Sequence, residues 1–107
     1  MKTLFANLAE VDHERSQERK LYREFLRVPA MSAGLYVLPA GGTDPQRPHH
    51  EDEMYYIVRG HAHFKAGDED REVHSGSVIY VAAAVEHHFY DISEELALLV
   101  FFAPAET

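Results

Sequence analysis

The sequence contains no cysteine and no tryptophan, and only 10 of its 107 residues are lysine or arginine. The absence of cysteine excludes a disulfide framework, a thiolate nucleophile and a thiolate metal site. No apolar run approaches the roughly 20 residues of a membrane-spanning helix. The first residues also lack the apolar core of a signal peptide. We therefore expect a soluble, cytoplasmic protein.

Basic residues are outnumbered by 18 aspartate and glutamate residues, which gives a formal net charge of -8. Such a charge repels nucleic-acid backbones and anionic lipid surfaces, so we expect neither as a partner. A chain of this length is large enough for one hydrophobic core and too short for two. The composition therefore predicts a single acidic domain, and its charge alone does not identify the partner.

Eight histidines stand out in a chain of this length. Six of them form close pairs: His49 and His50, His61 and His63, His87 and His88. Without thiolates, imidazole and carboxylate are the remaining side chains for binding a metal ion. The pairs are therefore the first place to look for a site.

The chain has the rhythm of a β protein. Met1–Leu8 could form an edge strand, and Glu10–Lys20 is polar and suits a surface loop or a short helix. From residue 21 onward about eight short segments rich in β-branched and aromatic residues alternate with turn signals such as Arg59-Gly60. These segments are LYREFLRV, AGLYVL, EMYYIV, AHFKA, REV, SVIYV, HHFYDI and ALLVFFA. Because no βαβ alternation occurs, an antiparallel barrel or sandwich is predicted, and closing the barrel would hide its edges.

Two segments place histidine beside a strand. In the first, a Pro-rich loop delivers His49, and Glu53 opens a strand on which Tyr55 shares its face. In the second, a glycine turn and an apolar strand precede His87, which opens another strand. The two histidines could meet inside one barrel. Alternatively, the acidic run 51–53 is a solvated turn, as charge runs usually are.

These two segments resemble the motifs of the cupin superfamily. Gly41, His49, Glu53 and Gly60 match the first motif, G-x5-H-x-H-x3/4-E-x6-G. Gly76 and His87 match the second, G-x5-P-x-G-x2-H-x3-N, and 15 residues separate the two motifs. The resemblance covers Leu35 to Phe102. It implies a single all-β domain: a jelly-roll antiparallel barrel over residues 35–103, preceded in residues 1–34 by a strand, a short helix or loop, and the first barrel strand.

The resemblance also implies a metal site. In the family, the motif histidines and the glutamate bind a divalent metal, which here carries over to His49, Glu53 and His87. The bound ion could be iron, manganese, nickel or zinc, since sequence does not choose the metal. Arg47 stands where the family has its first histidine, and a guanidinium cannot ligate a cation. Either Gln46 or His50 could supply a fourth ligand.

The second motif also departs from the family pattern. Ala82 and Ala84 replace its proline and glycine, and Asp91 replaces its asparagine. One reading of these departures is a barrel that has lost its metal and serves an interaction. Three convergent ligands can nevertheless hold a metal ion.

Two residues near the proposed ligands suit catalysis. Arg47 could clamp a substrate carboxylate, although a solvent-facing loop arginine is the simpler interpretation. Tyr55 could donate a hydrogen bond to a developing oxyanion. Tyr55 and Phe89 each lie two residues beyond a proposed ligand and should line the cavity. By the same alternation His61, His63 and His88 should face outward.

The function predicted from these residues is a small metal-dependent cupin acting on a small polar or carboxylated molecule, with dioxygenase-like or isomerase-like chemistry. The alternative is a non-catalytic small-molecule-binding or accessory module, because the fold hosts both. The C-terminal run LALLVFFA is apolar on both faces, which suits a strand covered by a second subunit, so a homodimer is expected.

Overall fold

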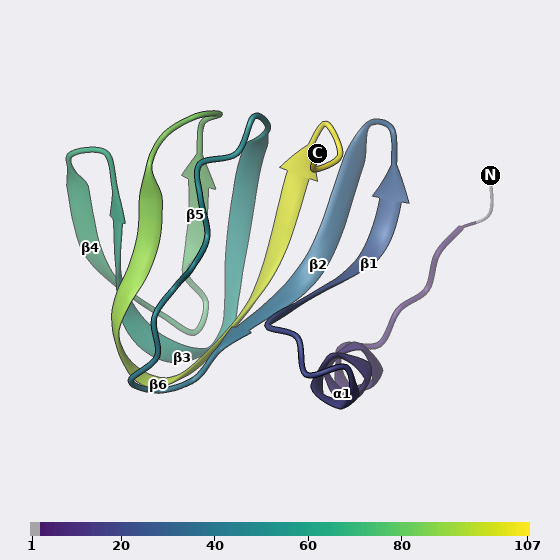
Figure 1. Ribbon diagram of the computed structural model, residues 1–107, viewed down its shortest axis with the longest axis horizontal. Coiled ribbons are helices and arrows are strands. Elements are labelled where there is room, and N and C mark those ends of the chain that lie inside the picture. Colours follow the sequence, from purple (N-terminus) through teal and green to yellow (C-terminus); the bar gives the residue numbers. More distant parts are fainter. Residues whose placement is uncertain (1–2) are drawn as a thin grey trace.

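The computed structural model describes residues 3–107 as one antiparallel sheet with a helix on its outer side (Figure 1). The elements in chain order are α1 (Leu8–Gln17), β1 (Tyr22–Val28), β2 (Met31–Leu38), β3 (Asp52–Ala66), β4 (Glu69–His74), β5 (Val78–Val81) and β6 (His87–Ala103). The strands follow the order β1-β2-β6-β3-β4, and β5 pairs with β3. The sheet curves as in a jelly roll but does not close, because β1 and β4 each pair with a single strand among the described residues.

Two long strands, β3 and β6, run antiparallel along most of their length and form the frame of the sheet. The first half of β3 also pairs with β5, and its second half with β4. The sequence predicted about eight short strands, and that number is wrong. Segments 53–58 and 62–66 join into β3, and segments 87–92 and 97–103 join into β6.

The turn predicted at Arg59-Gly60 is a bend inside β3, where the pairing with β6 shifts register. Gly60 has a φ of +103°, and a Cβ atom there would lie 2.3 Å from the backbone oxygen of Glu95. The glycine signal therefore marks a bulge and a close approach of two strands, since a bulge also requires unusual backbone angles.

The N-terminal region differs from its prediction. The edge strand expected over Met1–Leu8 does not form in residues 3–7, and residues 1–2 lie outside the described part. Instead the Asn7 side chain accepts a hydrogen bond from the Ala9 amide at 2.9 Å and caps α1. Val11 is the buried residue of α1 and packs with Leu35 and Ala97 on the outer side of the sheet. The short helix expected within residues 10–20 is confirmed, and it begins two residues earlier than predicted, at Leu8.

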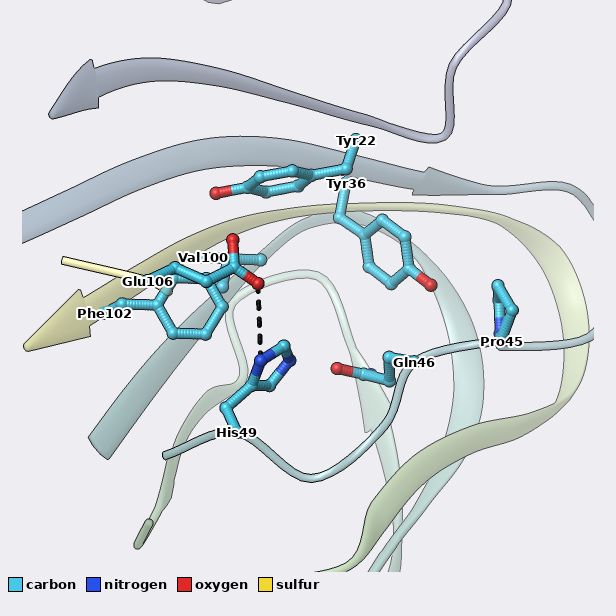
Figure 2. A pocket seen from close by; sticks show the side chains of 8 residues that line it. All are labelled: Tyr22, Tyr36, Pro45, Gln46, His49, Val100, Phe102 and Glu106. Atoms are coloured by element: carbon cyan, nitrogen blue, oxygen red, sulfur yellow. Dashed lines mark ion pairs between the residues drawn. The ribbon is translucent and has the colours of Figure 1, made fainter. Parts of the chain in front are cut away.

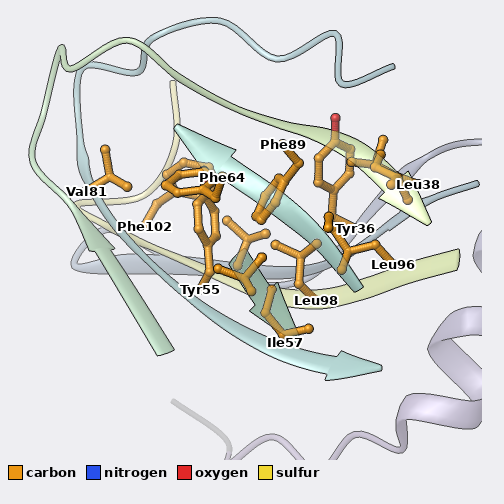
Figure 3. Close-up of a cluster of buried hydrophobic side chains, with 14 residues drawn as sticks. Tyr36, Leu38, Tyr55, Ile57, Phe64, Val81, Phe89, Leu96, Leu98 and Phe102 are labelled. Atoms are coloured by element: carbon orange, nitrogen blue, oxygen red, sulfur yellow. The ribbon is translucent and has the colours of Figure 1, made fainter. Parts of the chain in front are cut away.

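The inner side of the sheet holds the main core (Figure 3). Along β3, Glu53, Tyr55 and Ile57 are buried, while Met54 and Tyr56 face solvent, as the alternation predicted. The same inner side carries the rings of Phe64, Phe89 and Phe102. Two charged or polar ligand candidates, Glu53 and His87, thus point into an aromatic core.

A membrane-spanning helix is not found among residues 3–107: α1 has 10 residues and is polar.

Candidate metal centre

The three predicted ligands come together at one end of the sheet. His49 lies on the loop before β3, Glu53 near the start of β3, and His87 at the start of β6. One ligating atom from each side chain lies within 4.8 Å of the others. The side chains of Glu53 and His87 are 1% exposed. The alternative of a solvated acidic turn therefore fails for Glu53 and also for buried Glu51.

The hydrogen bonds of His87 show which of its ring nitrogens carries a proton and which faces the other ligand candidates. Nδ1 lies 2.7 Å from the backbone oxygen of Val85, which can only accept, so Nδ1 carries a proton. In a neutral imidazole the other nitrogen, Nε2, then has a lone pair. Nε2 faces Glu53 Oε1 at 2.8 Å and Gln46 Oε1 at 3.1 Å. Three acceptor atoms thus converge and require a cation among them, either a proton on Nε2 or a metal ion.

The protonation of His87 reflects this arrangement. Burial acts to lower the pKa of the imidazole, but the Glu53 carboxylate and the Val85 carbonyl together outweigh it and raise the pKa above its ordinary value. In the absence of a metal ion, a proton on Nε2 thus satisfies the oxygen atoms around it.

Gln46 is held in place by a residue that the sequence did not single out. The Asp44 carboxylate accepts hydrogen bonds from Gln46 Nε2 at 2.6 Å and from the hydroxyl of Tyr36 at 2.6 Å. It also accepts from the backbone N–H of Phe89 at 2.9 Å. Because Asp44 can only accept from the amide nitrogen, the amide oxygen of Gln46 is the atom that faces His87. Of the two fourth ligands considered, the structure brings in Gln46 and leaves His50 exposed.

Tyr55 is fully buried beside the ligands. Its hydroxyl lies 2.8 Å from Glu53 Oε2 and 3.0 Å from Gln46 Oε1, and its single proton serves one of them at a time. Burial and the neighbouring Glu53 carboxylate raise the pKa of the phenol, which therefore remains a donor at neutral pH. Tyr55 and Phe89 pack together next to the ligands, with ring centroids 5.5 Å apart.

A pocket of about 220 Å³ opens beside His49 (Figure 2). Its lining consists of Tyr22, Tyr36, Pro45, Gln46, His49, Val100, Phe102 and Glu106. The Tyr22 hydroxyl is buried and has no hydrogen-bond partner among the described residues. No lysine or arginine of that part of the chain lines the pocket, and Arg47 is exposed. The clamp role of Arg47 stays a prediction.

Glu106 is the second functional candidate that sequence reasoning missed. It follows the last strand and lies outside both motifs, so no pattern pointed to it. Its carboxylate enters the pocket, with Oε2 3.3 Å from His49 Nδ1. Burial raises the pKa of this carboxyl group, while the nearby His49 acts in the opposite direction.

Three further histidines, His61, His63 and His88, lie where the strand alternation placed them. His61 and His63 are half-exposed on the outer side of β3, while Ala62 and Phe64 between and beyond them are buried. His88 is exposed, one residue from buried His87. The prediction that these three face away from the centre is confirmed.

Comparison with known proteins agrees with the geometry. Residues 34–103 match the family of the cupin domain. An uncharacterized protein of Streptomyces coelicolor is 48% identical over 100 residues, which cover 94% of this chain and 95% of that protein.

Solved structures show the same architecture. The Bacillus halodurans protein BH2720 superimposes with a TM-score of 0.77 at 18% identity, covering 96% of this chain and 82% of that one. A cupin 2 conserved barrel domain protein from Rhodopseudomonas palustris gives 0.71 at 19% identity, over 80% of this chain. This chain spans only 61% of that protein. At such identities the likeness concerns the fold alone.

Proposed function

The chain belongs to the cupin family, and from this premise we propose that it binds one divalent metal ion through His49, Glu53 and His87 and acts on a small polar molecule in the adjoining pocket. The observation that supports the proposal is the convergence of His87 Nε2 with two oxygen atoms, from Glu53 and Gln46, at 2.8 and 3.1 Å. Apart from a proton, the cation that this group of one nitrogen and two oxygen atoms binds is a metal ion. Imidazole with carboxylate suits iron, manganese, nickel or zinc. Gln46 is the fourth ligand in this proposal.

Residues around the ligands suit this role. Asp44 holds Gln46, and Tyr55 holds Glu53, so the ligands are oriented before a metal arrives. Partners of this kind fix ligand orientation in metal sites and influence affinity. When bound, the metal would supply Lewis-acid chemistry or, as iron, chemistry with dioxygen.

The pocket favours an uncharged substrate over a carboxylate. Its lining includes the acidic Glu106 and no lysine or arginine of the described residues. The unpartnered Tyr22 hydroxyl can donate a hydrogen bond, and Glu106 can accept one, which together suit a hydroxyl or carboxamide group. Val100 and the rings of Tyr36 and Phe102 provide apolar walls. A carboxylated substrate would require Arg47 to turn in from the surface.

Two reaction classes fit this set of groups. The two histidines and one carboxylate resemble the ligands of iron dioxygenases, which leave positions open for substrate and oxygen. An isomerase-like reaction instead moves a proton without redox change and needs only a polarised carbonyl and a nearby base. A module that binds without reaction is the alternative from another class.

Metal dependence separates these possibilities. The protein is loaded in turn with Fe(II), Mn(II), Ni(II) and Zn(II) and offered a panel of hydroxylated ketones, sugars and carboxamides, with Glu53→Gln as the control. Oxygen uptake confined to the iron form supports the dioxygenase-like reaction, and product formation with zinc supports the isomerase-like one. Binding without turnover favours the binding module. Failure to take up any of the four metals contradicts the proposal.

The expected homodimer is a further part of this proposal. Four large side chains on the outer face of β3 and β5 are 42–64% exposed: Met54, Tyr56, Val78 and Tyr80. Met54 and Tyr56 pair across to Phe101 and Leu99 of the apolar C-terminal strand. A second copy would cover this surface. Light scattering that gives the mass of a monomer at micromolar concentration would rule the dimer out.

A further inference from the structure

Residues 104–107 follow β6, fold back against the ends of β1 and β2, and are held there by hydrogen bonds. The backbone N–H of Glu106 donates to Ser32 Oγ at 2.9 Å, and the Glu106 carbonyl accepts from Arg27 Nη2 at 2.6 Å. Next to it the Thr107 hydroxyl donates to the buried Glu51 at 2.8 Å. The backbone of Glu106 is therefore fixed at both its N–H and its carbonyl, which sets the direction in which its side chain leaves the backbone.

That direction leads into the pocket and to His49. Glu106 Oε2 lies 3.3 Å from His49 Nδ1 (Figure 2), and the two side chains are 26% and 19% exposed. Phe102 meets the same imidazole ring edge-on, with ring centroids 4.8 Å apart. The second ring nitrogen of His49 lies on the side of Gln46 in Figure 2, and the Gln46 amide oxygen in turn contacts His87.

We propose that Glu106 is a positioning residue of the metal centre, which holds His49 with the proton on Nδ1 and thereby leaves Nε2 free as the ligand atom. A carboxylate beside one imidazole nitrogen fixes the tautomer and the ring orientation and makes the other nitrogen a better ligand. The metal part of this inference rests on the proposed function. The tautomer part stands on the metal-free protein alone.

This role differs from that of a simple wall of the pocket. A wall requires only bulk and shape, which glutamine supplies as well as glutamate. Positioning requires an acceptor at Nδ1, which glutamine supplies through its neutral amide oxygen and alanine does not supply at all. The order of the variants therefore distinguishes the two roles.

Zinc affinity measures the positioning directly. Competition with a chromophoric chelator gives the Kd of wild type, Glu106→Ala, Glu106→Gln and the matched surface control Glu95→Gln, whose exposed carboxylate pairs with Arg59. We expect Glu106→Ala to bind about 10- to 100-fold more weakly, the usual effect of losing such a partner. Glu106→Gln should lie between Glu106→Ala and wild type, and the control should equal wild type. Unchanged affinity in Glu106→Ala would overturn the proposal.

The tautomer of His49 provides a second readout that needs no metal. Long-range proton–nitrogen spectra of the metal-free protein, labelled with ¹⁵N-histidine and recorded at alkaline pH, should show the His49 proton on Nδ1 in wild type. In Glu106→Ala it should move toward Nε2, the nitrogen that carries it in unconstrained peptides. The same tautomer in both proteins would overturn the inference. If wild type binds no zinc, the proposed function fails, and these spectra still decide the role of Glu106.

Discussion

Replacing Glu53 with glutamine separates the structural role of this side chain from its role as a ligand. Glu53 is 2% exposed, and its two oxygens lie 2.8 Å from the Tyr55 hydroxyl and 2.8 Å from His87 Nε2. Glutamine has the same shape: its oxygen can accept from Tyr55, and its amide nitrogen can donate to the lone pair of neutral His87. At a pH at which His87 is neutral, we therefore expect the metal-free variant to keep its free energy of unfolding within about 1 kcal/mol of wild type, the net contribution of one hydrogen bond.

Metal binding should respond differently, because the variant loses a charged ligand. Losing a residue that only hydrogen-bonds a metal ligand weakens binding by up to about 100-fold. Because Glu53 is itself a proposed ligand, we expect its loss to raise the Kd for zinc by at least that factor. Zinc at 100 times the wild-type Kd stabilises wild type by about 2.7 kcal/mol, but the variant by only about 0.4 kcal/mol. At about 4–8 °C per kcal/mol, the unfolding midpoint rises by about 11–22 °C in wild type and about 2–3 °C in the variant.

Thermal unfolding followed by circular dichroism, with and without zinc, tests both expectations. Glu95→Gln makes the same chemical change on the exposed side of β6 and should behave as wild type. An equal rise of the midpoint in wild type and Glu53→Gln would refute the reasoning, since zinc would then bind elsewhere. A metal-free Glu53→Gln that does not fold would show that the buried carboxylate is needed for structure.

Three other results are expected. The pKa of His87 is raised in the folded protein, so protonation of His87 stabilises the fold. This stabilisation is complete below the pKa of the unfolded state, about 6.5, and is lost as pH rises through the pKa of the folded state. Urea titrations of metal-free protein from about pH 6 to about pH 9 should show this decline, and His87→Gln should lack it; a flat wild-type profile would contradict the ion pair with Glu53. Gln46→Ala should weaken zinc binding in a chelator competition whereas His50→Ala should not, and equal effects would remove Gln46 as fourth ligand. Gly60→Ala should destabilise the fold by roughly 2–5 kcal/mol in urea, because its Cβ would meet backbone atoms of β6 and its φ is left-handed; an unchanged midpoint would show that the bulge relaxes freely.

Local patterns predicted much of the fold. The alternation of apolar and polar residues gave the buried face of β3 correctly, because a sheet with one buried face imposes a period of two. Strand number was harder to predict. Gly60 has the same sequence signature in a bulge as in a turn, and only the partner strand β6 decides between them. At the N-terminus, the cap formed by Asn7 prevailed over the apolar character of Leu4 and Phe5, which remain exposed.

The part of the candidate site that lies within the two sequence motifs could be predicted. His49, Glu53 and His87 lie at positions that both the strand pattern and the family resemblance indicated, and the structure brings them together. Asp44 and Glu106 were not predictable in the same way. Asp44 acts through hydrogen bonds to three separate segments, and Glu106 reaches the pocket only because the chain after β6 folds back. Contacts of this kind depend on tertiary structure and leave no periodic signal.

Metal content is the most direct test of the account. Untagged protein, purified without chelators, is analysed by mass spectrometry beside Glu53→Ala and His87→Ala. We expect close to one divalent ion per chain in wild type and its loss in both variants. A wild-type protein that holds no metal, even after reconstitution with iron, manganese, nickel and zinc, would contradict it, and so would variants that retain the ion.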